Sequence, residues 1–267
     1  MNEPGRVQSR GTMKIASWNV NSLKVRLDQV LDWMDQASPD VLGLQETKLT
    51  DDNFPTEVFS GRGLYAVHAG QPAYNGVALI SRSPIEDVVR EIPGFEDPDR
   101  RVIAGTIDGV RVINLYVING RSTDDPMYQR KLEWLDAVRA WVAEELRQHP
   151  RLVVVGDFNI APEDRDVHDP EAWHEKVLCS TPEREALGRL LSLGLEDCYR
   201  LFDQPERVYS WYDYRQLAFR RKRGLRIDLI LASEPLASRC VAAGIDLAPR
   251  RHQRPSDHAP VWAEFRR

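Results

Sequence analysis

The chain has few cysteines and no long hydrophobic run. Its three cysteines, Cys179, Cys198 and Cys240, lack paired spacing, which argues against a disulfide framework and against a zinc site. No stretch approaches the roughly 18 apolar residues of a membrane span, and residues 1–12 lack the apolar segment of a secretory signal. We therefore expect a protein of the reducing cytoplasm that has no membrane contact, with a flexible leader over residues 1–12.

The chain also lacks a positive charge excess. Its formal net charge is −5, which argues against bulk electrostatic binding to nucleic acid but leaves room for a local basic patch. One candidate is "FRRKRGLR", residues 219–226, which has five cations in eight residues. A solvated surface loop is the alternative that this run alone does not exclude.

What is present is a series of apolar, strand-like segments interspersed with amphipathic helices. The strand candidates are residues 13–20, 41–47, 76–82, 110–117, 151–160, 226–233 and 259–265. Apolar residues at helical spacing predict a helix through residues 27–34, ended by Pro39, and a second within residues 127–148. A third begins near Ser180, which has capping-box spacing to Glu183.

No repeat, linker or composition break divides the chain. The pattern is also not a clean alternation of strand and helix, so a purely parallel sheet is disfavoured. We expect one α/β domain over residues 13–267, with two sheets packed together and helices outside.

Polar side chains gather at the ends of the predicted strands, where a rigid scaffold presents chemistry. They are Asn19, Glu46, Asp157, Asn159, Asp228, Asp257 and His258. Asp228 is the most informative, because a carboxylate between Ile227 and Leu229 is costly to bury without a cation, metal or imidazole nearby. Taken singly, each residue also fits a turn, a helix cap, a surface acid or a structural ion pair.

As a set, these residues offer carboxylate and amide oxygens and one imidazole, without a cysteine pair. Such oxygens suit Mg²⁺ or Mn²⁺ better than zinc. A divalent ion polarises a phosphoryl oxygen and offsets charge on a leaving oxygen. The set therefore indicates hydrolysis of a phosphate ester.

The ordered stretches "SWNVNSLKVRL", "DVLGLQETKL", "NGVALISR", "LYVING", "GDFNIAP", "RGLRIDLILAS" and "PSDHAPVWAEF" run from residue 13 to the C-terminus. On these motifs the chain resembles the exonuclease III family, the metal-dependent apurinic/apyrimidinic (AP) endonucleases of the endonuclease/exonuclease/phosphatase superfamily. The resemblance implies a four-layered α/β sandwich of two mixed sheets flanked by helices. It also implies a monomeric, Mg²⁺-dependent hydrolase of base excision repair, with Mn²⁺ able to substitute. Such an enzyme cleaves double-stranded DNA 5′ to abasic sites and removes 3′ blocking groups or nucleotides.

The resemblance assigns roles to individual residues. The implied metal-binding residues are Asn19, Glu46, Asp157, Asn159 and Asp257, and the implied catalytic residues are Tyr116, Asp157, Asn159, Asp228 and His258. Asp157 would orient or deprotonate the attacking water, and Asn159 would donate to the phosphate. His258 would contact the scissile phosphate while Asp228 orients its ring. A neutral His258 is the rival general base, and one or two metal ions remain possible.

Other residues bear on the substrate. Trp211, with Leu225 and Ile227, is expected to line a small apolar pocket that accepts a flipped-out sugar without its base; a plain core role is the alternative for Trp211. The cations Arg221, Lys222 and Arg223 are expected to hold DNA phosphates. Asn119 lies in "YVING", near the implied tyrosine.

Two positions depart from the family pattern. His168 replaces a smaller residue, and we hypothesise that it narrows the path for a 3′-terminal nucleotide and favours AP cleavage. Ile118 stands where proline is frequent, which questions the rigidity of that loop.

Two other functions stay open from the sequence. One is a phosphatase acting on inositol phosphates or phospholipids, and the other is a non-catalytic DNA-binding protein that kept the fold. The basic run and Trp211 favour DNA, and the complete set of acids and amides favours turnover. The expected setting is the bacterial cytoplasm, with use at the nucleoid.

Overall fold

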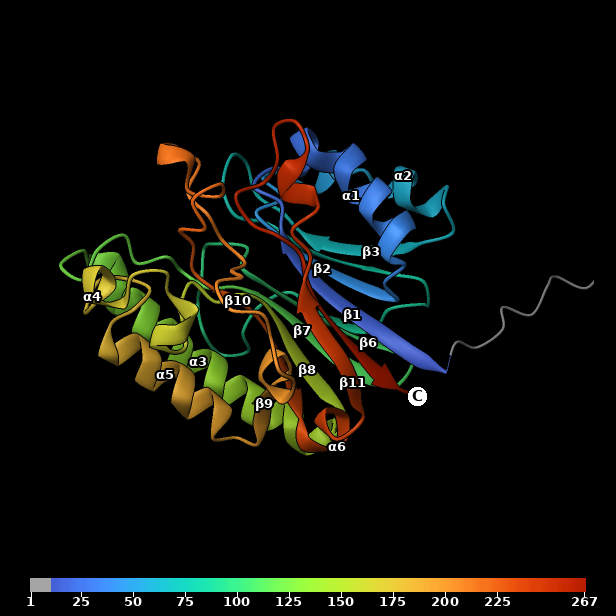
Figure 1. Cartoon of the computed structure of the whole chain (residues 1–267). Coiled ribbons are helices and arrows are strands. Elements are labelled where there is room, and N and C mark those ends of the chain that lie inside the picture. Colours follow the sequence, from blue (N-terminus) through green and yellow to red (C-terminus); the bar gives the residue numbers. More distant parts are fainter. Residues whose placement is uncertain (1–10) are drawn as a thin grey trace, which may run out of the picture.

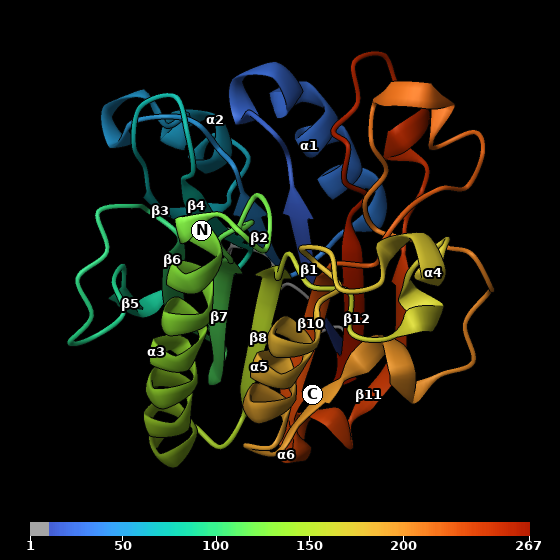
Figure 2. The same cartoon turned by 90° about the vertical axis from the view of Figure 1, so that its left-hand side faces the viewer.

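Two sheets packed face to face form the centre of the molecule, in a computed structural model that describes residues 11–267. Each sheet has six strands and mixes parallel with antiparallel pairs. Helices cover both outer faces (Figures 1 and 2). This confirms the predicted four-layered α/β sandwich. Most of the predicted leader lies outside the described residues; of its last two residues, Thr12 already begins the first strand.

The first sheet contains the N-terminal and C-terminal strands. Its order is β11-β12-β1-β2-β4-β3, with bounds β1 Thr12–Asn19, β2 Val41–Gln45, β3 Tyr65–Ala69, β4 Val77–Ser81, β11 Cys240–Ile245 and β12 Val261–Arg266. The second sheet has the order β5-β6-β7-β8-β10-β9, with bounds β5 Glu86–Val89, β6 Val102–Ile107, β7 Val110–Tyr116, β8 Leu152–Asp157, β9 Leu195–Asp197 and β10 Asp228–Ser233.

Each sheet contains a parallel pair joined by a helix. β1 and β2 pair in parallel across α1 (Leu23–Ala37), and β7 and β8 pair in parallel across α3 (Pro126–Gln148). A parallel connection needs such a crossover, and it leaves the carboxyl ends of both strands at the same edge. Two pairs of carboxyl ends therefore become available to build a site.

The remaining helices are short, apart from α5. Their bounds are α2 Thr56–Ser60, α4 Pro170–Trp173, α5 Thr181–Leu191 and α6 Glu234–Ala237. Single 3₁₀ turns span Asp51–Asn53, Asp164–Asp166, Cys198–Leu201, Arg215–Leu217 and Pro249–Arg251. Figure 1 shows α1 and α2 outside the first sheet and α3 and α5 outside the second. No helix in the described part of the chain is both long and apolar enough to cross a membrane.

Local signals explain where these helices begin. Asp125 caps α3 by accepting from the backbone N–H of Met127, and proline follows at the first helical position. Ser180 and Glu183 form the predicted capping box at the start of α5. α1 ends where Ser38 adopts a left-handed conformation, directly before Pro39.

A polar bridge crosses the largely apolar space between the sheets. Asn114 of β7 donates to the backbone oxygens of Leu44 and Ala78, both at 2.9 Å, and accepts from Gln45 at 2.6 Å. Gly43 permits this approach, because a Cβ there would lie 3.0 Å from the Asn114 side chain. The bridge fixes the position of one sheet against the other, since every misaligned packing would leave buried amides unpaired.

Candidate active site

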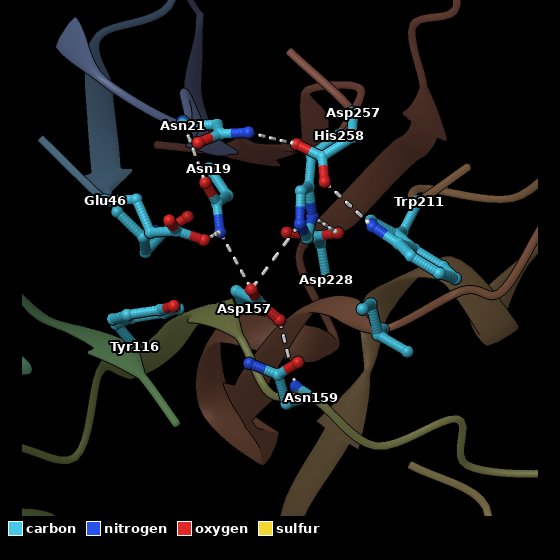
Figure 3. A network of polar contacts seen from close by, with 12 residues as sticks. Asn19, Asn21, Glu46, Tyr116, Asp157, Asn159, Trp211, Asp228, Asp257 and His258 are labelled. Atoms are coloured by element: carbon cyan, nitrogen blue, oxygen red, sulfur yellow. Dashed lines mark hydrogen bonds and ion pairs between the residues drawn. The ribbon is translucent and has the colours of Figure 1, made fainter. Parts of the chain in front are cut away.

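The polar residues at the strand ends converge at one edge of the two sheets. Asn19 ends β1 and pairs in register with Gln45, the residue before Glu46. Asp157 ends β8 and pairs in register with Tyr116 on one side and with Asp228 on the other. Each sheet therefore contributes side chains to one centre, which Figure 3 shows from close by.

Three side chains lie close enough to hold one cation. A carboxylate oxygen of Glu46, one of Asp157 and a ring nitrogen of His258 all lie within 4.8 Å of one another. Asp157 and His258 are 1% and 4% exposed, whereas the Glu46 side chain is 19% exposed. The two carboxylates, one buried and one partly open, fit a divalent ion that still meets solvent or substrate, and His258 lies beside them. The residues present therefore fit the metal that the sequence implies.

His258 is held by Asp228. Its Nδ1 lies 2.8 Å from Oδ2 of Asp228, and its Nε2 lies 3.7 Å from Oδ2 of Asp157. The backbone N–H of Asp228 donates to Ser210 Oγ at 3.0 Å, which holds the backbone from which the carboxylate extends. Burial lowers the pKa of His258, but the two carboxylates more than offset it and raise this pKa to about 10. The imidazole is therefore charged at neutral pH.

The carboxyl group of Asp157 also has a raised pKa, for a different reason. Burial, together with the negative charge of Asp228, raises its pKa to about 7. The imidazolium of His258 and a hydrogen bond from Asn19 act in the opposite direction and limit this increase. The Asn19 amide donates to Oδ2 of Asp157 and to Oε1 of Glu46, both at 2.9 Å. This carboxylate can therefore exchange a proton near neutral pH.

Three of the predicted metal ligands, Asn19, Asp257 and Asn159, have side-chain oxygens bonded to other groups in this structure. The side-chain oxygen of Asn19 accepts from the backbone N–H of Asn21 at 3.0 Å, so its nitrogen faces the carboxylates. Asp257 accepts from Asn21 at 3.0 Å and from the indole N–H of Trp211 at 3.1 Å. Asp257 is also outside the cluster formed by Glu46, Asp157 and His258. Here it anchors the Trp211 side of the site (Figure 3).

Tyr116 lies next to Glu46. Burial and the negative charge of Glu46 raise the pKa of its hydroxyl well above the ordinary value, so the hydroxyl stays protonated. The Arg101 guanidinium lies 5.0 Å from the centroid of its ring. Tyr116 is thus a neutral hydrogen-bond donor at the rim of the site.

Asn159 and Asn119 form a second layer below Asp157. Asn159 donates to the backbone oxygen of Val117 and accepts from Asn119, both at 2.9 Å. Its backbone is left-handed, with φ of 49°, and its N–H donates to Oδ1 of Asp157 at 2.9 Å. In this arrangement both amides are fixed by neighbours around the acid.

Sequence reasoning missed two residues of the site. Lys48 pairs with Glu46 at 2.9 Å and donates to Asn21 at 2.6 Å, and Asn21 links this pair to Asp257. Asn21 lies two positions after Asn19 and Lys48 two positions after Glu46, both inside the quoted motifs. The signal that the sequence offered for them was a short polar run that continues past the end of each strand.

The Trp211 region is only partly the pocket that was predicted. Leu225 and Ile227 are completely or almost completely buried, at 0% and 1% exposed, and lie under the half-buried Trp211 in one apolar cluster. They form a floor and cannot line an open cavity. The hollow above has a volume of about 370 Å³, and its walls include Trp211, Trp173, His168 and Arg223.

His168 borders that hollow. Its ring lies 6.4 Å from that of Trp173, which in turn lies 6.5 Å from that of Trp211. Its Nδ1 lies 3.2 Å from the backbone oxygen of Gly224, so the imidazole is tied to the end of the basic run.

The basic run divides into two parts. Arg221, Lys222 and Arg223 are exposed, as the proposed phosphate contacts require. Arg226 is 1% exposed and forms ion pairs with Asp166 at 2.6 Å and with Asp197 at 2.7 Å. The fifth cation of the run is therefore structural, because its charge is already neutralised inside the protein.

Ile118, which stands where proline is frequent, is packed into the protein. It is 3% exposed and belongs to the apolar core beneath α3.

Residues 16–258 match the sequence profile described as the Endonuclease/Exonuclease/phosphatase family. A solved structure titled as the 3′ phosphatase NExo from Neisseria, bound to product DNA hairpin, is 49% identical with a TM-score of 0.93, over 95% of this chain and 99% of that one. An AP endonuclease from Archaeoglobus fulgidus is 38% identical with a TM-score of 0.91, over the same shares. Exodeoxyribonuclease III of Haemophilus influenzae is 36% identical over 95% of this chain and all of the relative.

Proposed function

Because the chain belongs to the endonuclease/exonuclease/phosphatase family, we propose that it is a Mg²⁺-dependent DNA repair hydrolase. It cleaves the phosphodiester 5′ to an abasic nucleotide and removes nucleotides or phosphate groups from 3′ ends. Water replaces the leaving oxygen in each case, and the DNA strand is left with a 3′-hydroxyl. The observation that carries the proposal is the convergence of Glu46, Asp157 and His258 on one edge of the sheets.

Asp157 is the proposed base for the attacking water. Its pKa of about 7 belongs to the metal-free carboxylate, and a divalent ion bound to it would lower that value, so the assignment rests on its position at the centre of the site. Asn19 and the backbone N–H of Asn159 donate to its two oxygens, so the carboxylate keeps one orientation during the transfer.

His258 is proposed to stabilise negative charge on the phosphate. A ring with its pKa raised to about 10 is a poor base at neutral pH, but it is a charged donor. Asp228 accepts from Nδ1 and leaves the Nε2 proton for the substrate. The same argument disfavours His258 as the rival general base.

Glu46 and Asp157 are the proposed ligands for the divalent ion, which would offset charge on the phosphate and on the leaving oxygen. Carboxylate oxygens favour Mg²⁺, and Mn²⁺ accepts the same ligands. Asn19 and Asp257 join the ligand set only if their side chains rotate away from their present partners.

DNA binding is proposed to use the exposed part of the basic run and the hollow beside Trp211. The exposed Arg223 stands at one wall of that hollow, and the exposed Arg221 and Lys222 directly precede it in the chain. Phosphates along a duplex would be neutralised there while the reacting nucleotide reaches Asp157. The protein is proposed to act as a monomer in the bacterial cytoplasm.

The test is a labelled duplex carrying a single abasic site, with a second duplex ending in a 3′-phosphate. With Mg²⁺ both are processed, and with EDTA neither is. Asp157→Asn should lower kcat by about 10²–10⁴-fold. Inositol phosphate is the control substrate. Turnover of inositol phosphate without cleavage of either duplex would overturn the proposal.

His168 decides how the two activities are balanced. Our hypothesis that it restricts a 3′-terminal nucleotide predicts that His168→Gly raises exonuclease activity relative to AP cleavage. Because the ring borders the hollow beside Trp211, the opposite shift would mean that it occupies space used by the abasic sugar. An unchanged ratio would remove His168 from either role.

A further inference from the structure

A fully buried ion pair lies behind the amides of the site. Lys131 of α3 and Glu183 of α5 both have side chains that are 0% exposed, and they contact each other directly. Burying two charges is expensive, and replacing such a pair by apolar residues is often neutral or stabilising. A stability role alone therefore gives a weak account of this pair.

The ammonium group makes further contacts that point to the site. Lys131 Nζ donates to the backbone oxygen of Asn159 at 2.6 Å and to that of Asn119 at 3.2 Å. With Glu183 as the third acceptor, all three ammonium protons have a partner. One side chain thus joins the loop that follows β7 to the loop that follows β8.

The carboxylate of Glu183 is also held by several hydrogen bonds. It accepts from the backbone N–H groups of Leu178 and Ser180, at 3.1 and 3.2 Å, and from the Ser180 hydroxyl at 2.6 Å. The carboxylate is therefore held by the start of α5, and it determines where the ammonium of Lys131 lies.

The two peptide groups that Lys131 holds belong to residues whose side chains act at the site. Asn159 has a left-handed backbone, with φ of 49°, and its N–H bonds to Asp157 while its side chain bonds to Asn119. The carbonyl that Lys131 holds and the N–H that bonds Asp157 belong to the two peptide planes that meet at the Cα of Asn159. A carbonyl that rotated away from Lys131 would release this Cα, from which the side chain that bonds Asn119 extends. The buried charge can therefore control the geometry of the amides.

We propose that Lys131, neutralised by Glu183, is a positioning residue for hydrolysis: it fixes the loops after β7 and β8 and so orients the amides of Asn119 and Asn159. The inference rests on the proposed function. It assigns Lys131 no contact with substrate and predicts an effect on turnover more than on binding.

The test compares Lys131→Met with Arg111→Met. Arg111 forms another buried ion pair between β7 and α3, with Glu145 at 2.6 Å, but at the far end of both elements. Rates are measured on the abasic and 3′-phosphate duplexes at a temperature well below both melting temperatures. Lys131→Met should lower kcat about 10–100-fold with KM changed less than about threefold. Arg111→Met should keep kcat within about twofold.

Two further measurements separate positioning from stability. In an Asn119→Ala/Asn159→Ala background, Lys131→Met should cost less than about threefold, because both amides that it orients are gone. Hydrogen exchange of residues 157–161 should increase in Lys131→Met and not in Arg111→Met, whatever the substrate is. If Lys131→Met does not fold, the double variant Lys131→Met/Glu183→Met, which leaves no unpaired carboxylate, is used in its place.

The outcomes are distinguishable. No cleavage by the wild-type protein would overturn the proposed function, while the exchange result still tests the positioning role. Wild-type activity with an unchanged kcat in Lys131→Met would overturn the positioning role alone, as would an undiminished effect in the Asn119→Ala/Asn159→Ala background.

Discussion

At the scale of single residues, the carboxylate of Asp228 sets the charge of the imidazole of His258. The two groups are 2.8 Å apart and both are buried. Removing the negative charge while keeping the shape therefore leaves the ring in place and lowers its pKa from about 10.

We expect Asp228→Asn to lower kcat by about 10²–10⁴-fold at neutral pH. Activity that needs the charged ring falls as pH rises through its pKa, so the alkaline limit of the remaining activity should move to lower pH. A pH–rate profile of both proteins checks this. A variant with the alkaline limit unchanged would show that the charge of His258 is not required.

Two arginines of the basic run should respond differently to substitution. Arg226→Met leaves Asp166 and Asp197 without their buried partner, which should reduce the free energy of unfolding by about 3–5 kcal/mol. Arg221→Met removes an exposed cation and should change it by less than about 0.5 kcal/mol. Urea unfolding measures the free energy of unfolding of both variants. Similar values would contradict the division of the basic run into a structural arginine and exposed cations.

The sequence predicted which residues form the site better than it predicted where their side chains point. Asp228 between two apolar neighbours demanded a partner, and His258 is that partner. For Asn19 and Asp257 the motif gives the position alone. The direction of Asn19 depends on a local contact from Asn21. That of Asp257 depends on Asn21 and Trp211, which lie far from it in the chain.

At the scale of elements, the site depends on two strand–helix–strand units. β1, α1 and β2 supply Asn19 and Glu46, and β7, α3 and β8 supply Tyr116 and Asp157. The loop of residues 212–223 is a separate element that brings exposed cations to the edge of the site.

That loop should control the salt dependence of DNA binding. Arg221→Ala/Lys222→Ala is expected to reduce the slope of log K against log salt by about 2, because each phosphate contact contributes about 1. Fluorescence anisotropy on a duplex in EDTA measures it. The matched control is Arg147→Ala/Arg189→Ala, which removes cations from the outer helices α3 and α5. An equal loss in the control would mean that only net charge matters.

Long periodic elements were predictable, and short ones were not. The strands β1, β2, β4, β7, β8, β10 and β12 all lie within one or two residues of predicted segments, except for looser ends beside the polar motifs. β5 and β9 were missed because four and three residues carry little periodicity. β3 and the six-residue β6 were not predicted either. β11 was missed because its half-buried sequence, CVAAGI, lacks a clear apolar face.

At the scale of the whole molecule, the buried acids of the site lower stability when no metal is bound. Asp157 has a pKa of about 7 in the folded protein against an ordinary 3.8. The stability that its protonated form contributes is present below 3.8 and is lost as pH rises through 7. His258, raised to about 10 from 6.5, adds stability below 6.5 that is lost as pH rises through 10. Both groups make the metal-free protein less stable at pH 8 than at pH 5.

Mg²⁺ should reverse this loss. The ion competes with the proton on Asp157, so the rise in melting temperature on adding Mg²⁺ should be larger at pH 8 than at pH 5. The stabilisation reaches about 2.7 kcal/mol at a concentration 100 times Kd. Calorimetry measures both shifts, with Asp157→Asn as the control in which they shrink. Equal shifts at both pH values would contradict the assignment of Asp157 as a ligand.

The polar bridge of Asn114 and Gln45 has a consequence for how the enzyme fails when heated. Glu46 comes from one sheet and Asp157 from the other, so cleavage requires the two layers to stay aligned along their shared seam. A small slip along that seam would separate the ligands while every strand still kept its neighbours. Heat inactivation should therefore precede the loss of secondary structure, and Asn114→Ala should widen the gap between the two.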